Sequence, residues 1–252
     1  MAWNWPVFCN DTISGESVPS CLASFSQGST PTYLNWIISA WGWTILVALS
    51  SLAVALVTGL IVGTLRTLPE RPLVVRIGNA WVELFRNIPL LVQLFLWYFV
   101  LPEFFPALKK LPPAVLVVMA IGFFTSARVA ELVRAGIQSL PKGQRYAGMA
   151  LGLTTAQTYR LVLLPMALRI VIPPLTSETM NVVKNSSVAF AVSIAELTFF
   201  ARQAGEETSA PIEMYMAVTI LYALSAYAIN RIMRLIERRA HVPGFVTGDS
   251  AH

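Results

Sequence analysis

Long apolar runs, separated by short polar segments, dominate this chain. From Ser17 to Leu65 there is no charged residue, and from Trp36 onward the run is apolar enough to cross a membrane. A hydrocarbon core of ~30 Å requires about 20 such residues per helix. The pattern predicts an all-α integral membrane protein with five transmembrane helices, at residues 41–65, 73–101, 114–136, 166–192 and 212–234.

Proline and glycine mark the breaks within this pattern. Pro89 lies near the middle of the second predicted span, and Pro173-Pro174 are expected to bend the fourth. The polar stretch after the third span is predicted to form two short helical pieces around Gly152, and residues 195–211 are predicted to form an outer loop. Gly59 and Gly63 make a GxxxG pattern that would allow two helices to approach closely.

Charge agrees with a membrane location and predicts an orientation. Only 12% of the residues are charged and 56% are hydrophobic, whereas soluble domains carry about 25% charged residues. Most Lys and Arg residues follow the first, third and fifth spans, which by the positive-inside rule places the N-terminus outside and the C-terminus in the cytoplasm. The net charge of +5 is then a topology signal, and it does not require nucleic acid as a partner.

The same reasoning divides the chain into three parts. Residues 1–35 contain no Lys or Arg and do not resemble a signal peptide, so they are predicted to be a periplasmic arm before a permanent first helix. Residues 36–239 form one transmembrane domain, with a polar cytoplasmic loop at 141–165. Residues 240–252 form a cytoplasmic tail. Cys9 and Cys21 both lie in the arm, where an oxidising compartment would permit a disulfide, the alternative being two free thiols.

Ionisable residues inside the predicted spans form two kinds of pattern. Unpaired charges at the bilayer centre cost at least ~2.5–3.5 kcal/mol, so opposite charges are expected to pair. Two predicted pairs are spaced i, i+3, and a polar stripe follows one face of the fourth span. The pairs are Glu83–Arg86 and Arg128–Glu131, and the stripe contains Glu178, Asn181, Lys184 and Asn185. Structural pairing, head-group contacts and a substrate path remain alternatives for these residues.

The sequence contains no recognisable catalytic constellation. His241 and His252 are the only histidines and both lie in the tail, which argues against a histidine-based triad or a histidine-rich metal site in the core. A GxxxxGK[ST] phosphate-binding sequence is also absent. We therefore expect a transport subunit that is not an enzyme and binds no cofactor itself. If ATP drives it, a separate subunit must bind the nucleotide and Mg²⁺.

The polar stretch Gly143–Pro165 resembles the EAA loop of bacterial ABC importer permeases, the segment that contacts the ATPase in that family. Ala147, Gly148, Gly152 and the closing Leu164-Pro165 match its spacing. The sequence departs from the pattern at three positions, since Tyr146 replaces Glu, Gly148 replaces the second Ala and Val162 replaces Ile. The resemblance implies a coupling role for Arg145, Tyr146, Ala147, Gly148, Gly152, Arg160 and Pro165.

Three further segments resemble the polar amino-acid branch of these permeases, the histidine/glutamate/glutamine type. They are Val82–Phe95, Ala127–Gln144 and Asn181–Ala189. The arm segment Thr32–Leu34, the stretch Val162–Glu178 and the terminal Val-Pro-Gly are most similar to a glutamate/aspartate permease. This resemblance implies a type I importer fold in the bacterial inner membrane. It also implies ABC ATPase subunits, a second permease subunit in a heterodimer, a periplasmic binding protein and contact with membrane lipid.

One alternative substrate class and three other classes of function are possible for this pattern. A permease for glutamine, histidine or basic amino acids differs only in substrate. An ion-coupled secondary carrier or channel would be expected to show inverted repeats and broken helix pairs, which the sequence does not show. An intramembrane enzyme would need a catalytic constellation, and a purely structural anchor would not need the polar stripe.

Overall fold

The computed structural model of this chain describes residues 4–18, 21, 32–69 and 71–240, and most of these residues are helical. Within these residues the only β-type pairings are isolated bridges, Asn10–Ser17 and Asp11–Thr32. The helical elements, in chain order, are η1 (Trp5–Cys9), α2 (Tyr33–Leu65), α3 (Pro72–Asn87), α4 (Leu90–Phe95), η2 (Leu96–Val100), α5 (Leu101–Phe104), η3 (Pro106–Lys110), α6 (Pro113–Gln138), α7 (Lys142–Ala150), α8 (Thr155–Thr158), η4 (Tyr159–Leu163), α9 (Leu164–Asn185), η5 (Ser186–Val192), α10 (Leu197–Thr208) and α11 (Pro211–Ala240). The expected tail at 241–252 lies outside the described residues.

The predicted spans correspond to long apolar helices in the structure. Four helical segments are long and apolar enough to cross a membrane: α2, α6, the continuous stretch Thr155–Val192 and α11. A fifth span forms if α3 and the helical stretch Leu90–Phe104 are counted together. The break between these two occurs at Ile88 and Pro89. Ile88 is extended, with φ −97° and ψ 131°, as expected for a residue that precedes proline.

The described helices belong to two compact units, each built from three stretches of the chain. The first unit comprises residues 1–51, 90–121 and 182–227, and the second comprises 52–89, 122–181 and 228–252. Helices α2, α6, α9 and α11 contribute residues to both.

The first unit has a core in which η1, α2, α10 and α11 meet. Ile37, Leu197, Phe200 and Met214 are buried there together with Val7 of η1. Helix α10 corrects the sequence prediction of a loop at 195–211. Its apolar residues Leu197, Phe200, Ala201 and Ala204 recur at i, i+3, i+4 and i+7 and are all buried. This spacing is that of an amphipathic helix, so the sequence did carry the signal.

The second unit is built on close contact between helix backbones. A Cβ atom at Gly59 would lie 2.6 Å from Val129 Cβ, and one at Gly63 would lie 2.7 Å from the Ala130 carbonyl oxygen. The GxxxG pattern of α2 therefore faces α6, and its two glycines leave the space that α6 occupies. Further along α6, a Cβ at Gly136 would lie 2.6 Å from Val171 Cγ2 on α9.

Candidate functional site

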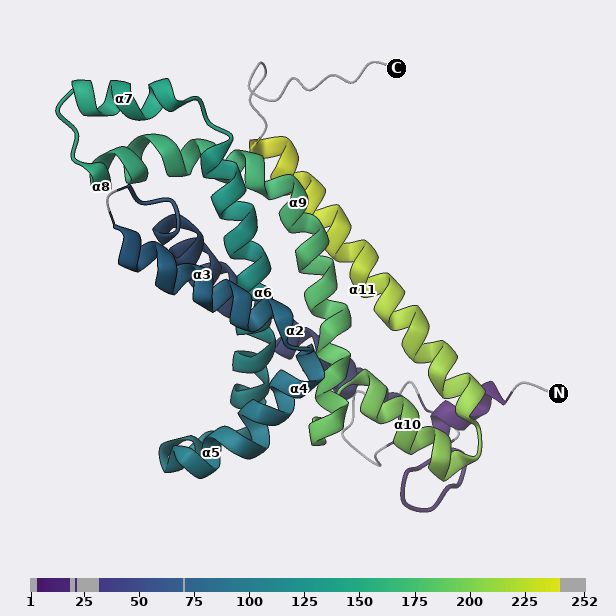
Figure 1. The fold of residues 1–252 in the computed structure, drawn as a ribbon. Coiled ribbons are helices and arrows are strands. Elements are labelled where there is room, and N and C mark those ends of the chain that lie inside the picture. The colour runs from purple at the N-terminus through teal and green to yellow at the C-terminus, as the bar shows by residue number, and fades with distance from the viewer. Residues whose placement is uncertain (1–3, 19–20, 22–31, 70, 241–252) are drawn as a thin grey trace. The chain divides into compact units, whose positions relative to one another are not determined.

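The polar loop at 141–165 folds into two helical pieces around Gly152, as predicted. Helix α7 runs beside the segment formed by α8 and η4, and the chain reverses between them (Figure 1). Gly152 has φ +78°, a left-handed conformation that side chains other than glycine adopt at a cost. Its amide donates to the Met149 carbonyl at 3.0 Å. The amide of Leu153 donates to the Gly148 carbonyl at 3.1 Å. Together these bonds form a Schellman motif that ends α7.

Two further contacts close the reversal. A capping box begins α8, in which the Thr154 side chain accepts from the Gln157 amide and Gln157 accepts from the Thr154 amide. Gly148 is buried against Thr158, and a Cβ at Gly148 would lie 3.0 Å from Thr158 Cγ2. The family pattern has alanine at this position. In this chain the space that an alanine methyl needs is restricted by Thr158.

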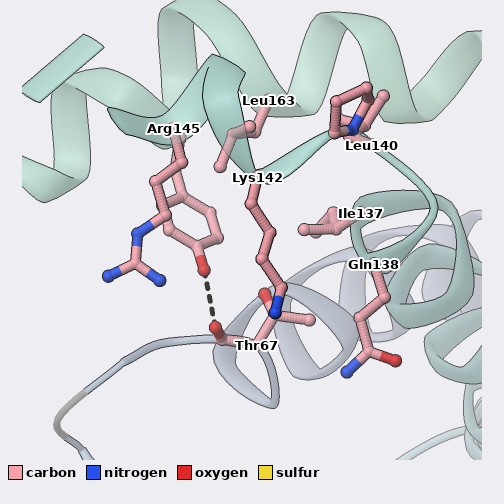
Figure 2. A pocket seen from close by; sticks show the side chains of 9 residues that line it. Thr67, Ile137, Gln138, Leu140, Lys142, Arg145 and Leu163 are labelled. Atoms are coloured by element: carbon pink, nitrogen blue, oxygen red, sulfur yellow. Dashed lines mark hydrogen bonds between the residues drawn. The ribbon is translucent and has the colours of Figure 1, made fainter. Parts of the chain in front are cut away.

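A hydrogen bond joins the loop to the end of α2. The Tyr159 hydroxyl donates to the Thr67 carbonyl oxygen at 2.6 Å. Figure 2 shows this bond at the wall of a pocket of about 190 Å³. The pocket is lined by Thr67, Ile137, Gln138, Leu140, Pro141, Lys142, Arg145, Tyr159 and Leu163. Because Tyr159 is itself buried, the loop is held to α2 by packing as well as by the hydrogen bond.

The outer side of the loop is apolar and exposed. Tyr146 is 63% exposed, Met149 49% and Leu151 81%. Ala147 and Ala150 lie exposed on the same helix and offer little obstruction to a neighbouring surface. Of the other predicted coupling residues, Arg160 and Pro165 are exposed, whereas Arg145 is partly buried and lines the pocket of Figure 2. The loop thus presents an exposed apolar surface, with the positive charge of Arg160 nearby in the same loop.

A polar cluster that the sequence analysis did not identify surrounds Arg66, the residue before Thr67. Arg66 donates through Nε to Asn79 Oδ1 at 2.7 Å and through Nη2 to Glu131 Oε1 at 2.8 Å. Arg134 also contacts Glu131, with an Nε–Oε2 distance of 3.3 Å. The Arg66 side chain is 6% exposed, and Gly78 packs against its Cγ. This cluster joins the end of α2 to α3 and α6.

The charges that the sequence paired at i, i+3 have other partners in the structure. Arg128 does not pair with Glu131: its Nη1 lies 3.7 Å from Glu178 Oε2 on α9, and its guanidinium lies 5.1 Å from the Phe124 ring centroid. Glu131 pairs with Arg66 and Arg134 instead. Arg66 and Glu178 lie outside α6, so a spacing rule within one helix cannot foresee their contacts, whereas Arg134 is an i, i+3 partner of Glu131 on α6 itself.

The first predicted pair does not form either. Glu83 and Arg86 are both exposed on α3, and no ion pair of 4.0 Å or less joins them in the part of the chain that is described. At exposed positions solvent competes for both charges, so little holds two long side chains in a pairing geometry.

The residues of the polar stripe on α9 do not share one environment, because only Glu178 pairs with Arg128. Glu178 is mostly buried and is occupied by Arg128. Lys184 is exposed, and Asn181 and Asn185 are partly buried. Among the described residues, no carboxylate lies within 4.0 Å of the Lys184 ammonium.

The arm and α10 are held in the first unit by specific contacts. Cys9 and Cys21 form a disulfide. The Asn4 amide donates to Glu213 Oε1 at 2.8 Å. Glu196 is fully buried at the start of α10, where its carboxylate accepts from the amides of Thr198 and Phe199.

Burial raises the pKa of the Glu196 carboxyl, and the bonds that it accepts oppose that shift in part. The Tyr222 hydroxyl on α11 is one of these donors, at 2.8 Å from Glu196 Oε2. Sequence reasoning placed Glu196 only among the outer-loop acids. An acidic residue immediately before an apolar helical repeat is the N-cap signal that identifies it.

Among the described residues, no group of three or more His, Cys, Asp or Glu side chains is arranged to hold a metal ion.

Comparison with known proteins agrees with this geometry. The family described as binding-protein-dependent transport system inner membrane component matches residues 55–242. The chain is 39% identical over 256 residues to the glutamate/aspartate import permease protein GltJ of Escherichia coli (strain K12), with 98% of each chain covered. It is 36% identical to the probable glutamine ABC transporter permease protein GlnM of Bacillus subtilis (strain 168), over 78% of this chain and 89% of the relative.

Solved structures show the same fold. A chain of the crystal structure of an amino acid ABC transporter with histidines superposes with a TM-score of 0.71 at 29% identity, covering 82% of this chain and 95% of that one. A chain from the inward-facing MetNI methionine ABC transporter gives a TM-score of 0.71 at 24% identity, over 83% of this chain and 98% of that one. The chain therefore belongs to the family of binding-protein-dependent transport system inner membrane components, as an amino-acid ABC permease with the type I importer fold.

Proposed function

We propose that this permease imports glutamate or aspartate across the bacterial inner membrane. The observation that carries the proposal is the 39% identity to GltJ, because it extends over 98% of both chains. The similarity to GlnM covers 78% of this chain, and that to the glutamine permease GlnP of Escherichia coli (strain K12) covers 79% at 32% identity. The similarity to GltJ thus covers more of this chain than the other two similarities do, and glutamine is the second candidate substrate.

The coupling loop is proposed to receive the ATPase. Its exposed residues Tyr146, Met149 and Leu151 form an apolar surface, and covering such a surface provides binding free energy of roughly 25 cal/mol per Å². The small residues Ala147 and Ala150 allow close approach, and Arg160 lies exposed to meet acidic groups. ATP and Mg²⁺ then bind to the partner ATPase, and this chain supplies no ligand to them.

The remaining partners follow from the family. We expect a second permease subunit in a heterodimer, a periplasmic binding protein that delivers the amino acid, and surrounding lipid. The proposal includes an orientation in the membrane. The arm at 1–35 faces the periplasm, and the loop at 141–165 and the C-terminus face the cytoplasm. The Lys and Arg distribution supports the orientation, and the Cys9–Cys21 disulfide is compatible with an oxidising periplasm.

The substrate path is proposed to include the exposed face of α9 at Lys184, with Asn181 and Asn185. An acidic amino acid carries a net charge of −1, and one ammonium with nearby amides can replace part of its hydration. Since Glu178 is occupied by Arg128, Lys184 is available to an anion. We propose that Glu178 positions the α9 side chains through its contact with Arg128 and does not itself bind the substrate.

Reconstitution tests the substrate assignment. The permease, its partner permease, the ATPase and each candidate binding protein are placed in liposomes, and uptake of labelled glutamate, aspartate, glutamine and histidine is measured with ATP inside. Uptake of glutamate or aspartate in preference to the others is expected. Transport of glutamine alone would overturn the acidic-substrate proposal and leave the importer class unchanged.

Lys184→Met tests the path in the same liposomes. Removing the ammonium should lower glutamate uptake at least tenfold, since a charge-assisted hydrogen bond contributes about 1.5–3 kcal/mol. Lys110→Met is the matched control, because Lys110 is an exposed lysine on η3 and should leave uptake unchanged. Basal ATPase activity should be the same in both variants. Equal uptake by the two variants would assign Lys184 to helix packing or lipid contact.

A further inference from the structure

The C-terminal part of α11 carries arginines in helical register around a pocket. Arg231, Arg234, Leu235 and Arg238 line a pocket of about 210 Å³. Their spacing is i, i+3, i+4 and i+7, which places all four on one face of the helix. The four residues belong to one unit, and none of them is part of the coupling loop or of the α9 stripe.

The charge of this pocket is positive and mostly uncompensated by the described residues. Arg234 and Arg238 are exposed, and in the described ranges no carboxylate lies within 4.0 Å of either guanidinium. Guanidinium groups bind phosphate oxygens with two parallel N–H donors, so several on one face favour a phosphate ligand over a single carboxylate.

The surroundings of the pocket are apolar and exposed. Leu235 lies between the arginines and is 60% exposed, and Ile232 and Ile236 are 56% and 45% exposed. These residues lie at the end of an apolar segment, Pro211–Arg239, that is long enough to cross a membrane. Isoleucine and leucine next to arginine at the end of a span are placed where acyl chains meet head groups.

We propose that this pocket binds the phosphate of an anionic phospholipid, with its acyl chains lying against Leu235 and Ile232. Arg234 and Arg238 bind the phosphate, and Arg231 extends the positive face. A bound lipid would hold the end of α11 at a fixed depth in the membrane. The ligand chemistry is a phosphate monoanion with apolar chains, and the bilayer is its source.

Native mass spectrometry of the full chain in a mild detergent tests the proposal. The probes are phosphatidylglycerol, phosphatidylcholine and glycerol phosphate, each added at the same concentration. The chain should retain phosphatidylglycerol in preference to phosphatidylcholine. Glycerol phosphate, which has the phosphate without acyl chains, should not displace it. The double variant Arg234→Gln/Arg238→Gln should bind phosphatidylglycerol about 30-fold more weakly, at roughly fivefold for each arginine.

Arg239→Gln is the matched control, because Arg239 is an exposed arginine at the same helix end that does not line the pocket. It should retain the lipid. Each variant is first checked for a single gel-filtration peak, and Arg234→Gln alone, with a fivefold loss, replaces the double variant if that variant aggregates. Equal loss in Arg239→Gln, equal retention of the two lipids, or displacement by glycerol phosphate would overturn the proposal. Unchanged lipid binding in the double variant, with loss of a copurifying ATPase, would assign the pocket to a protein partner.

Discussion

Two glycines of the loop at 141–165 are restricted for different physical reasons. At Gly148 the restriction is space, because a Cβ there would lie 3.0 Å from Thr158 Cγ2 and Thr158 would have to shift. Gly152 is needed for its backbone conformation, since φ is +78° and nothing lies within 4 Å of a Cβ placed there. Sequence comparison assigns both to one pattern, whereas the structure predicts different tolerances at the two positions.

Substitutions at Gly152 should follow conformational preference and not side-chain size. Gly152→Val should impair transport, because a left-handed conformation costs a β-branched residue on the order of 1–2 kcal/mol and the α7 cap is lost. Gly152→Asn should retain most activity, since asparagine adopts this conformation more readily. ATP-driven uptake in liposomes is the measurement. Equal activity of the two variants would show that the cap is not required for coupling.

Glu196 should make stability depend on pH. Its folded-state pKa is raised by burial above the ordinary value of 4.5, so its contribution is fully present below that value and is lost as pH rises through the folded pKa. The melting temperature of the wild-type chain, taken relative to Glu196→Gln, should therefore be highest at low pH and decrease above about 4.5. A constant difference between the two proteins at all pH values would contradict this assignment. Glu196→Ala should cost about 0.5–2 kcal/mol at any pH through loss of the cap.

Single residues were predictable where a backbone rule applied to them. The position of Gly152 between two helical pieces followed from the loop pattern. The contacts Arg128–Glu178 and Arg66–Glu131 did not, because they depend on which segments lie adjacent in three dimensions. Arg66 was read only as a topology signal, and no local pattern indicates that its side chain is buried against Asn79 and Glu131.

At the level of elements, close packing of α2 on α6 accounts for the GxxxG pattern. Both glycines of the pattern face α6, where added side-chain atoms would overlap Val129 or the Ala130 carbonyl. In a membrane, where lipid competes for apolar contact, such close approach is a principal source of helix association.

Alanine substitution in α2 should therefore depend on position. Gly59→Ala and Gly63→Ala should lower the melting temperature in detergent, because the new methyl group would force α2 away from α6. Gly42→Ala is the control in the same helix. Nothing lies within 4 Å of a Cβ at Gly42, and alanine favours a helix over glycine by about 1 kcal/mol. Destabilisation by Gly42→Ala equal to that at Gly59 would refute the packing explanation.

The long spans were predictable because their apolar runs exceed what a soluble helix needs. The second span was harder, since Pro89 divides it into α3 and α4. Helix α10 was missed because its three charged residues mask a short apolar repeat, which becomes clear only when residues 197, 200, 201 and 204 are compared. Its N-cap by Glu196 is a second signal that a search for transmembrane segments does not use.

For the whole molecule, the direction of insertion is the first property to measure. In a background with Cys9→Ala and Cys21→Ala, Glu16→Cys should react with a membrane-impermeant maleimide in intact cells. Ala150→Cys should react only after the membrane is opened. Both positions are exposed in this chain, and the cells used lack the partner ATPase that is proposed to cover the loop, so accessibility does not limit either reaction. Labelling of position 150 from outside would contradict the proposed orientation.

The division into two compact units was not predicted, since the sequence analysis treated residues 36–239 as one domain. Each unit combines stretches that are far apart in the chain, and apolar periodicity along one helix does not report such combinations. The family and fold were nevertheless accessible from sequence, because the loop at 141–165 combines several unusual positions at fixed spacing.

Together with the continuous chain, the hydrogen bond from Tyr159 to Thr67 connects the loop to two helices. One connection is covalent, since η4 continues directly into α9. The other is the hydrogen bond to Thr67, which directly follows Arg66 at the end of α2. Arg66 in turn donates to Asn79 and Glu131. The Schellman motif and the capping box restrain the reversal between α7 and α8. We therefore expect a force applied to α7 to reach both α9 and the end of α2.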